Sequence, residues 1–208
     1  MTRDGITIIE GLEVVRRRPV MYIGPGEPGR SLRSRLLEIV VGNIAKDTPE
    51  PREIRVALWR DGAMTVAYDG DPIPIKPFSR SVGGIAHPHL YEFFLYLHPG
   101  GGAAFRSSLA FGAVLNALSE RLVVSTMHTG DRYRAVFSRG MIVTLLARSP
   151  CETPLGTTWF TFCPDESIIT GAPLTESEAR AAADRATQDL GGAPIVIHDR
   201  STDTADWF

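Results

Sequence analysis

The fold of this chain is decided by the stretch Gly11-Leu-Glu-Val-Val-Arg-Arg-Arg-Pro-Val-Met-Tyr-Ile-Gly24. Within it, Leu12, Val15 and Arg16 recur at helical spacing, and Pro19 ends the helix because proline lacks the N–H that would continue the hydrogen-bond ladder. The local pattern therefore predicts a short amphipathic helix that leads into a tight turn. Taken alone, the three arginines predict a solvated basic helix end, which the negative end of the helix dipole stabilises.

Length and composition predict one cytoplasmic globular domain, or one domain with a small appendage. The 208 residues are 43% hydrophobic, which is enough for a core, and the net charge of −2 gives no sign of direct nucleic-acid or membrane-surface binding. No apolar run approaches membrane-spanning length, and the first residues lack the apolar segment of a signal peptide. The two isolated cysteines, Cys151 and Cys163, predict reduced thiols.

Hydrophobic periodicity predicts an α+β protein in which antiparallel strands are interspersed with helices. Ser31 is expected to cap one helix, Thr175 and Glu178 have the spacing of a capping box, and Asp61-Gly62 is typical of a hairpin turn. Helices are expected at 31–45, 90–97, 112–119 and 175–190, and strands at 53–58, 64–68, 121–128, 131–138, 141–147, 156–165 and 194–198.

One carboxylate stands out because Glu38 lies inside the apolar run 36–41. A charged group in such a position is costly unless it is paired or faces a pocket. Two interpretations remain open from the residues alone. Glu38 is either a functional carboxylate in a pocket or a helix-edge carboxylate paired with Arg35 or Arg33.

Four segments together resemble the amino-terminal ATPase (GHKL) domain of gyrase B, the ATP-dependent half of DNA gyrase, and of its topoisomerase IV counterpart, ParE. They are the opening stretch at 11–24, Leu97–Gly101, Asn116–Ser119 and Gly156–Asp165. The resemblance extends over residues 5–200 and implies a mixed, mainly antiparallel sheet with helices on one face. It further implies a gyrase-B-like domain at 1–170, followed at 171–208 by one helix and one strand that remain from the transducer domain.

The resemblance also implies a site for ATP and Mg²⁺. Glu38 matches the glutamate that acts as general base on the attacking water, and Asn43 is the nearest match to the asparagine that holds Mg²⁺. Arg134 matches an arginine that contacts coumarin inhibitors, and Thr157 matches a threonine of the adenine-reading network. The residues expected around the nucleotide are Asn43, Asp69, Gly70, Ile73, Pro74, Gly101, Gly112, Arg134 and Thr157.

Four positions depart from the family pattern. Gly42 stands where the family has its metal-holding asparagine, and Tyr68 stands where an aspartate reads adenine. Gly102 replaces a lysine, and Phe111 belongs to a segment that lacks the glycines of the phosphate loop. These departures favour a gyrase-B-like protein with an eroded ATP site, which hydrolyses no ATP or binds it weakly and works as a partner or regulatory protein. The partner is another protein or a second copy of the chain, for which Trp207-Phe208 is a candidate contact.

Two other hypotheses remain. One is a working ATPase in which Asn43 and Asp69 take over displaced roles. Asn43 is five residues from Glu38, and because one residue turns a helix by about 100°, the two share a face only if the helix bulges. The other hypothesis is a resistance or decoy protein, which would bind a gyrase inhibitor at Arg134 and at two further residues, Pro74 and Thr157.

Overall fold

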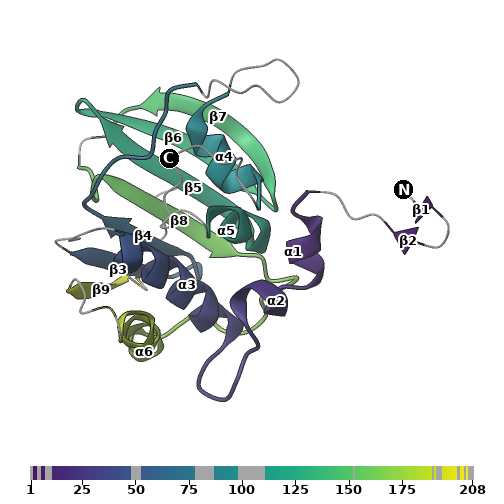
Figure 1. Cartoon of the computed structure of the whole chain (residues 1–208). Coiled ribbons are helices and arrows are strands. Elements are labelled where there is room, and N and C mark those ends of the chain that lie inside the picture. Colours follow the sequence, from purple (N-terminus) through teal and green to yellow (C-terminus); the bar gives the residue numbers. More distant parts are fainter. Residues whose placement is uncertain are drawn as a thin grey trace.

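The computed structural model describes residues 2–3, 6–7, 11–47, 53–77, 87–97, 111–151, 153–188, 190, 194–200, 202–203 and 205. Its main feature is a seven-stranded sheet with the strand order β7-β6-β5-β8-β4-β3-β9, shown with its helices in Figure 1. The strands are β3 (Ile54–Trp59), β4 (Met64–Tyr68), β5 (Ser119–His128), β6 (Asp131–Ser138), β7 (Met141–Ser149), β8 (Thr158–Pro164) and β9 (Ile195–Arg200). Two further short strands, β1 (Thr2–Arg3) and β2 (Ile6–Thr7), pair with each other.

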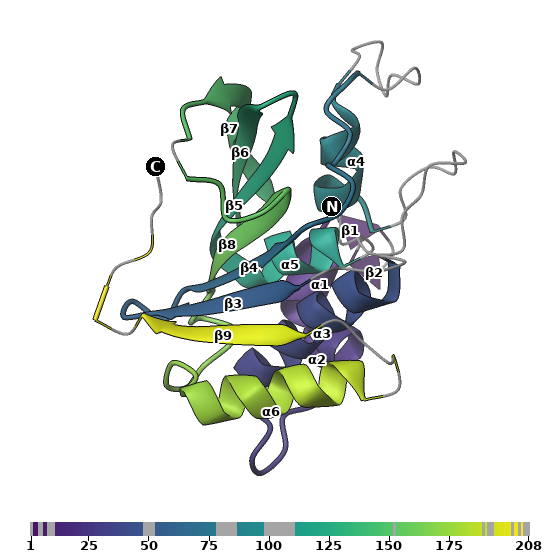
Figure 2. The ribbon, with the colours of Figure 1, turned by 90° about the vertical axis from the view of Figure 1, so that its left-hand side faces the viewer.

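All neighbouring strands of the large sheet are antiparallel except β3 and β9, which are parallel. The helices are α1 (Glu13–Arg17), α2 (Val20–Ile23), α3 (Leu32–Asp47), α4 (His89–Leu95), α5 (Gly112–Leu118) and α6 (Glu176–Thr187). Figure 2 shows them together on one side of the sheet, which we call the helix layer. The predicted fold class, a mainly antiparallel mixed sheet with helices on one face, is confirmed. None of the described helices has the length and hydropathy needed to cross a membrane.

Local capping and turn signals are confirmed by hydrogen bonds. The Ser31 hydroxyl accepts the Ser34 amide at 3.2 Å at the start of α3. Thr175 and Glu178 form the reciprocal capping box of α6, and the Asp61 carboxylate accepts the Ala63 amide in the turn between β3 and β4. These side chains satisfy amides that the helix and strand ladders leave open, which is why short-range sequence patterns located the ends of these elements well.

Strand alternation gives the sheet two different faces. One row of side chains, which includes Val124 and Phe160, is buried in the hydrophobic core beneath the helix layer. The residues next to them in sequence, Ser125, Trp159 and Thr161, point the other way, because successive side chains of a strand alternate between faces. We call this second side the open face, since none of the described helices covers it (Figure 2).

The opening stretch is a clamp between the first helix and the sheet. Arg16 is only 17% exposed; its guanidinium donates to the Ala117 carbonyl at 2.7 Å and to the Asp165 carboxylate at 2.8 Å. Arg139, from the turn after β6, donates to the same carboxylate at 2.8 Å. The interpretation as a solvated basic helix end is therefore wrong for Arg16, although Arg17 is exposed as that interpretation requires.

The elements after residue 170 are built into the same sheet and helix layer. Strand β9 pairs with β3, with Ile195 opposite Ile54, and α6 packs against α3. The buried face of α6 is made of small residues, Ala179, Ala182 and Ala183, which allow the two helices to lie close together. The domain boundary between 170 and 171 stays a prediction.

We expect Asp165→Asn to lower the free energy of unfolding by about 3 kcal/mol, because it leaves the guanidinium groups of Arg16 and Arg139 without their buried counter-charge. Burial would raise the Asp165 pKa, but hydrogen bonds from Ser167, Arg16 and Arg139 outweigh it and hold the pKa well below its usual range. The stabilisation is therefore present at neutral pH and is lost as the pH falls below the unfolded-state pKa of about 4.

Urea denaturation of the wild type and the variant between neutral and acidic pH measures both effects. Glu120→Gln, which removes the exposed partner of Arg139, is the matched control and should cost less than about 1 kcal/mol. Equal losses for the two variants would contradict the clamp.

Candidate functional site

On the helix-layer side of the sheet, four aromatic rings fill the space between β4, β8, α4 and α5. The ring centroid of Phe160 lies 6.3 Å from that of Tyr68, 5.9 Å from that of Phe94 and 5.5 Å from that of Phe111. None of the four side chains is more than 3% exposed. This part of the predicted nucleotide site is therefore occupied by packed hydrocarbon.

The threonine at this site is Thr158 and not its neighbour Thr157. Thr158 pairs with Tyr68 across the sheet, is fully buried, and its hydroxyl lies 3.3 Å from that of Thr126. Thr157 precedes β8, and its amide donates to Asp69 at 3.2 Å. Counting the strand alternation backwards from the buried Phe162 would have selected Thr158, because residues two and four apart share a face.

The loop after β4 is fastened to β5. The Ile73 amide donates to the Thr126 hydroxyl at 2.9 Å, and the Ile73 carbonyl accepts from His128 Nε2 at 2.7 Å. Ile73 is buried, Pro74 is half-buried and Gly70 is exposed. The predicted adenine-reading loop thus has its central backbone groups occupied by contacts within the chain.

Asp69 lies at the opposite side of the sheet from Tyr68. Its carboxylate accepts from Arg55 at 2.5 Å, and Arg55 pairs in register with Ala67 at the edge of the open face. Adjacent strand residues point to opposite faces, so Asp69 does not reach the side occupied by Tyr68. No shift of the strand end brings it there.

Glu38 is the centre of an arginine cluster on α3. Its carboxylate is only 8% exposed and accepts from Arg30 at 2.5 Å and 3.0 Å and from Arg185 at 2.7 Å. Arg35 lies 3.9 Å away, whereas Arg33 is bound to Glu166 instead. The paired interpretation of Glu38 therefore describes its surroundings, although the closest partners, Arg30 and Arg185, were not foreseen.

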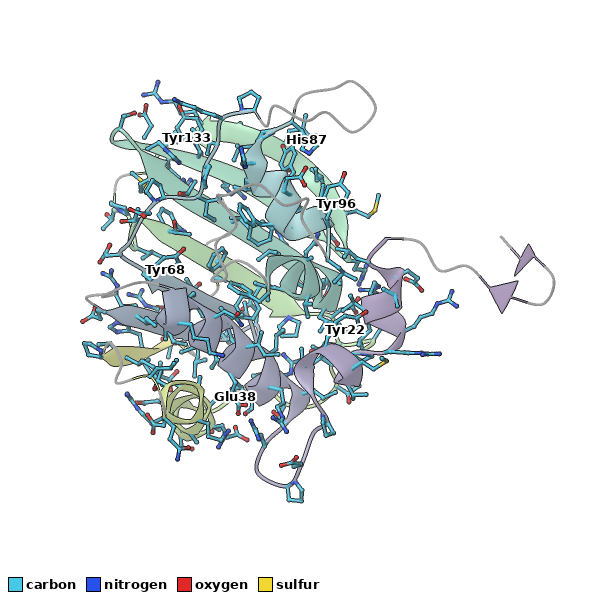
Figure 3. The ribbon with its side chains drawn as sticks, in the orientation of Figure 1. Tyr22, Glu38, Tyr68, His87, Tyr96 and Tyr133 are labelled. Carbon is cyan, nitrogen blue, oxygen red and sulfur yellow. The ribbon has the colours of Figure 1, made fainter. Side chains whose placement is uncertain are left out.

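The cluster changes the proton affinity of the carboxylate. Burial would raise the Glu38 pKa, but the hydrogen bonds and charges of Arg30 and Arg185 outweigh it, and the pKa lies below its ordinary value. Figure 3 labels Glu38 beside α6 and Tyr68 at the end of β4, so the carboxylate and the aromatic group occupy different parts of the helix layer.

Asn43 is on another face of α3. The helix is regular from Leu32 to Asp47, so five residues correspond to a rotation of about 140° from Glu38. The Asn43 amide donates to the Ile39 carbonyl of its own helix at 2.8 Å. Gly42 faces α6, where a Cβ atom would lie 3.3 Å from the Ala186 carbonyl oxygen. Glycine at this position serves the close packing of two helices.

Gly112 also has a packing role. A Cβ atom there would lie 2.7 Å from the Phe93 carbonyl oxygen, which is closer than real Cβ contacts allow, so glycine lets α5 begin against α4. The nearby Asn116 is fully buried and ties the same elements together, donating to the Phe94 carbonyl and accepting the Gly140 amide. Gly101, Gly102 and Trp207-Phe208 lie outside the described residues.

Arg134 belongs to the open face. It pairs in register with Ser125 and lines a cavity there, on the opposite side of the sheet from Tyr68 and Phe160. The structure thus distributes the predicted nucleotide contacts over two faces. Ile73 and Gly112 are near the helix layer, whereas Asp69 and Arg134 are not.

The described residues do not fit a Mg²⁺ ion at the predicted place. Both oxygens of Glu38 accept from guanidinium groups, and Asn43 is turned about 140° away from them. Within the described ranges no three acidic, histidine or cysteine side chains are grouped as metal ligands. Mg²⁺ takes oxygen ligands in near-octahedral geometry, which this arrangement does not supply. The catalytic and metal-binding roles of Glu38 and Asn43 stay predictions.

Comparison with known proteins identifies the family. The gyrase B protein of Thermus thermophilus is 32% identical over 208 residues, which cover 95% of this chain and 32% of that protein. The solved 43K ATPase domain of gyrase B from the same organism, in complex with an aminocoumarin, superposes with a TM-score of 0.73 at 30% identity and covers 91% of this chain and 49% of that one. The chain is homologous to the amino-terminal ATPase (GHKL) domain of gyrase B.

The same relationship extends to topoisomerase IV. The corresponding ATPase-bearing protein of DNA topoisomerase 4 from Caulobacter vibrioides is 33% identical over 172 residues, which cover 79% of this chain and 24% of that protein. No protein-family model matches the chain. This gyrase-B-like chain spans about a third or less of the length of the curated relatives named here.

We expect the ion pair between Glu38 and Arg185 to contribute to the stability of this gyrase-B-like domain. Glu38→Gln should lower the free energy of unfolding by about 2 kcal/mol, since it removes a charged acceptor shared by two guanidinium groups. Arg185→Gln should cost much less in the Glu38→Gln background than in the wild type, which gives a coupling energy of about 1 kcal/mol or more.

Urea denaturation of the four proteins of this double-mutant cycle provides the measurement. Arg17→Gln, which removes an exposed partner of Glu13, is the control and should change the free energy of unfolding by less than about 0.5 kcal/mol. Strict additivity of the two substitutions would contradict the cluster.

Proposed function

We propose that this chain is a gyrase-B-like domain with an eroded ATP site, which does not hydrolyse ATP and acts by binding a partner protein or a second copy of itself. The observation that carries the proposal is the state of Glu38. Both of its carboxylate oxygens are engaged by arginines from other elements, at 2.5 Å to 3.0 Å.

A general base must be free to take a proton from the attacking water. The guanidinium groups of Arg30 and Arg185 stabilise the ionised form of Glu38 and so make it a weaker base. They also occupy the lone pairs that a water molecule would need. Since a positioned base typically contributes about 10² to 10⁴ in rate, loss of this one function removes most of a slow hydrolysis.

The aromatic packing supports the same proposal. An adenine ring needs a cavity with a few polar groups that fix its orientation. Here Tyr68, Phe111 and Phe160 pack against one another and none is more than 3% exposed, while Asp69 is bound to Arg55. Opening a place for the base would cost the burial of at least one ring, about 3 to 5 kcal/mol.

Exposed apolar side chains support a function in partner binding. Met141, Val143 and Leu145 are 69%, 63% and 67% exposed on β7, which is the outermost strand at its end of the sheet. Apolar side chains at a free strand edge are typical of surfaces that pair with another chain.

The other two hypotheses have less support. A working ATPase would need Asn43 and Asp69 beside Glu38, but the regular helix and the strand alternation separate all three. The solved relative was crystallised with an aminocoumarin. An inhibitor-binding role for this chain would bring Arg134 and Ile73 to one ligand, yet the sheet lies between their two faces.

The test is a thermal-shift titration with ATP and Mg²⁺, followed by an ATPase assay on the same samples. A ligand at about one hundred times its dissociation constant stabilises a protein by about 2.7 kcal/mol, so binding is readily detected. We expect no more than a marginal shift and no turnover above the buffer rate.

Glu38→Gln and Asn43→Ala are the matched variants, one on each face of α3. Under the proposal neither changes the response to ATP. Mg²⁺-dependent turnover that Glu38→Gln abolishes would overturn the proposal and favour the working ATPase.

A further inference from the structure

We propose that the open face of the sheet carries a binding site for a planar aromatic anion, that is, a small molecule with an aromatic ring and a carboxylate or phosphate group. The site is a cavity of about 420 Å³, lined by Trp59, Thr65, Val123, Ser125, Arg132, Arg134, Pro150, Cys151, Thr153, Leu155, Trp159, Thr161 and Arg200. Its volume is in the range of small-molecule sites in proteins. It is separate from the predicted nucleotide site, which lies across the sheet, and does not depend on the proposed function.

The cavity is a direct product of strand register. Arg134 on β6 lies opposite Ser125 on β5, which lies opposite Trp159 on β8. These three side chains therefore form one cross-strand row and point to the same face. In the next row Thr65 on β4 lies opposite Thr161 on β8. A cation, a hydroxyl and an indole are thus set side by side on rigid strands.

The charge of the lining selects an anion. Arg132, Arg134 and Arg200 contribute three guanidinium groups, and none of the described residues that line the cavity is acidic. Arg132 is held in place by a 2.7 Å hydrogen bond to the Ser149 hydroxyl. Guanidinium groups are suited to carboxylate and phosphate because their planar N–H donors match two oxygens at once.

A buried hydroxyl points to a ligand that accepts or donates a hydrogen bond. The Thr65 hydroxyl accepts from Trp59 Nε1 and lies 2.9 Å from the Thr161 hydroxyl, so these two groups are satisfied. The Ser125 hydroxyl lines the same cavity at 0% exposure and has no partner among the described residues. Buried polar groups are rarely left unpaired, because an unmade hydrogen bond is costly.

The two tryptophans give the ligand its planar part. Trp59 and Trp159 both line the cavity, and the Arg200 guanidinium carbon lies 5.5 Å from the centroid of the Trp59 ring. An indole face favours stacking with another aromatic ring, and a cation above it adds attraction for the ligand's charge. Ring and anion together therefore fit this site better than either alone.

Three probes test the proposal on the whole chain: 1-naphthyl phosphate, which has both features; 1-naphthol, which has the ring alone; and inorganic phosphate, which has the anion alone. One readout is quenching of tryptophan fluorescence. The other is protection of Cys151, which lines the cavity, from alkylation by iodoacetamide, detected by mass spectrometry. Cys163 is the internal reference because it lies outside the cavity, and burial raises its thiol pKa to about 11.

We expect saturable binding of 1-naphthyl phosphate with protection of Cys151 alone, and binding at least about tenfold weaker for 1-naphthol and for inorganic phosphate. The double variant Arg134→Gln/Arg200→Gln should weaken 1-naphthyl phosphate at least about tenfold. Ser125→Ala should weaken it about fivefold with an unchanged melting temperature, since its hydroxyl has no described partner to lose. Asn43→Ala, on the far side of the sheet, should have no effect.

Two results would overturn the inference. One is absence of saturable quenching and of Cys151 protection at millimolar 1-naphthyl phosphate. The other is equal affinity in the wild type and the Arg134→Gln/Arg200→Gln variant while both remain folded by circular dichroism. Because the probe has neither a ribose nor a triphosphate, either result leaves the test of ATP hydrolysis unaffected.

Discussion

The rest of the structure depends on the buried carboxylate of Asp165. It receives guanidinium groups from Arg16, near the start of the chain, and from Arg139, in the turn between β6 and β7. Arg16 also binds the carbonyl at the end of α5, so one charged group connects the first helix, a central helix, the end of β8 and a hairpin. A single salt bridge at a surface would have little consequence, but with Asp165 at 1% exposure each partner is needed to compensate the others. The opening stretch of the sequence is thus a structural clamp.

The two faces of the sheet differ in chemistry because of strand alternation. Toward the helix layer the strands present aliphatic and aromatic side chains that pack tightly, and the predicted nucleotide contacts on that side are used for packing or for holding a loop. Toward the open face the same strands present hydroxyls, tryptophans and arginines. A one-residue difference in position, as between Thr157 and Thr158 or between Tyr68 and Asp69, therefore decides which chemistry a side chain joins.

Most of the fold was predictable from the sequence, because its signals are local. Period and capping residues such as Ser31 and Thr175 placed the helices, and the turn glycines placed the strands. The site was less predictable. Glu38 was recognisable as a costly buried charge, but its partner Arg185 is 147 residues away, and no local pattern connects them. Similarly, alternation can show that Ser125 and Arg134 each face one side of a strand, whereas only the register between β5 and β6 shows that they are neighbours.

The parallel pairing of β9 with β3 has a consequence for synthesis on the ribosome. Strand β3 ends at Trp59, yet its outer neighbour begins at Ile195, so one edge of the sheet stays unpaired while the intervening residues are made. During the same interval Glu38 lacks Arg185, and the side of α3 that α6 will cover is exposed. The nascent chain therefore carries an open strand edge and an incompletely compensated charge until residues 176–200 emerge, and long-range pairings of this kind form late. The order of synthesis makes this corner of the domain the last to close.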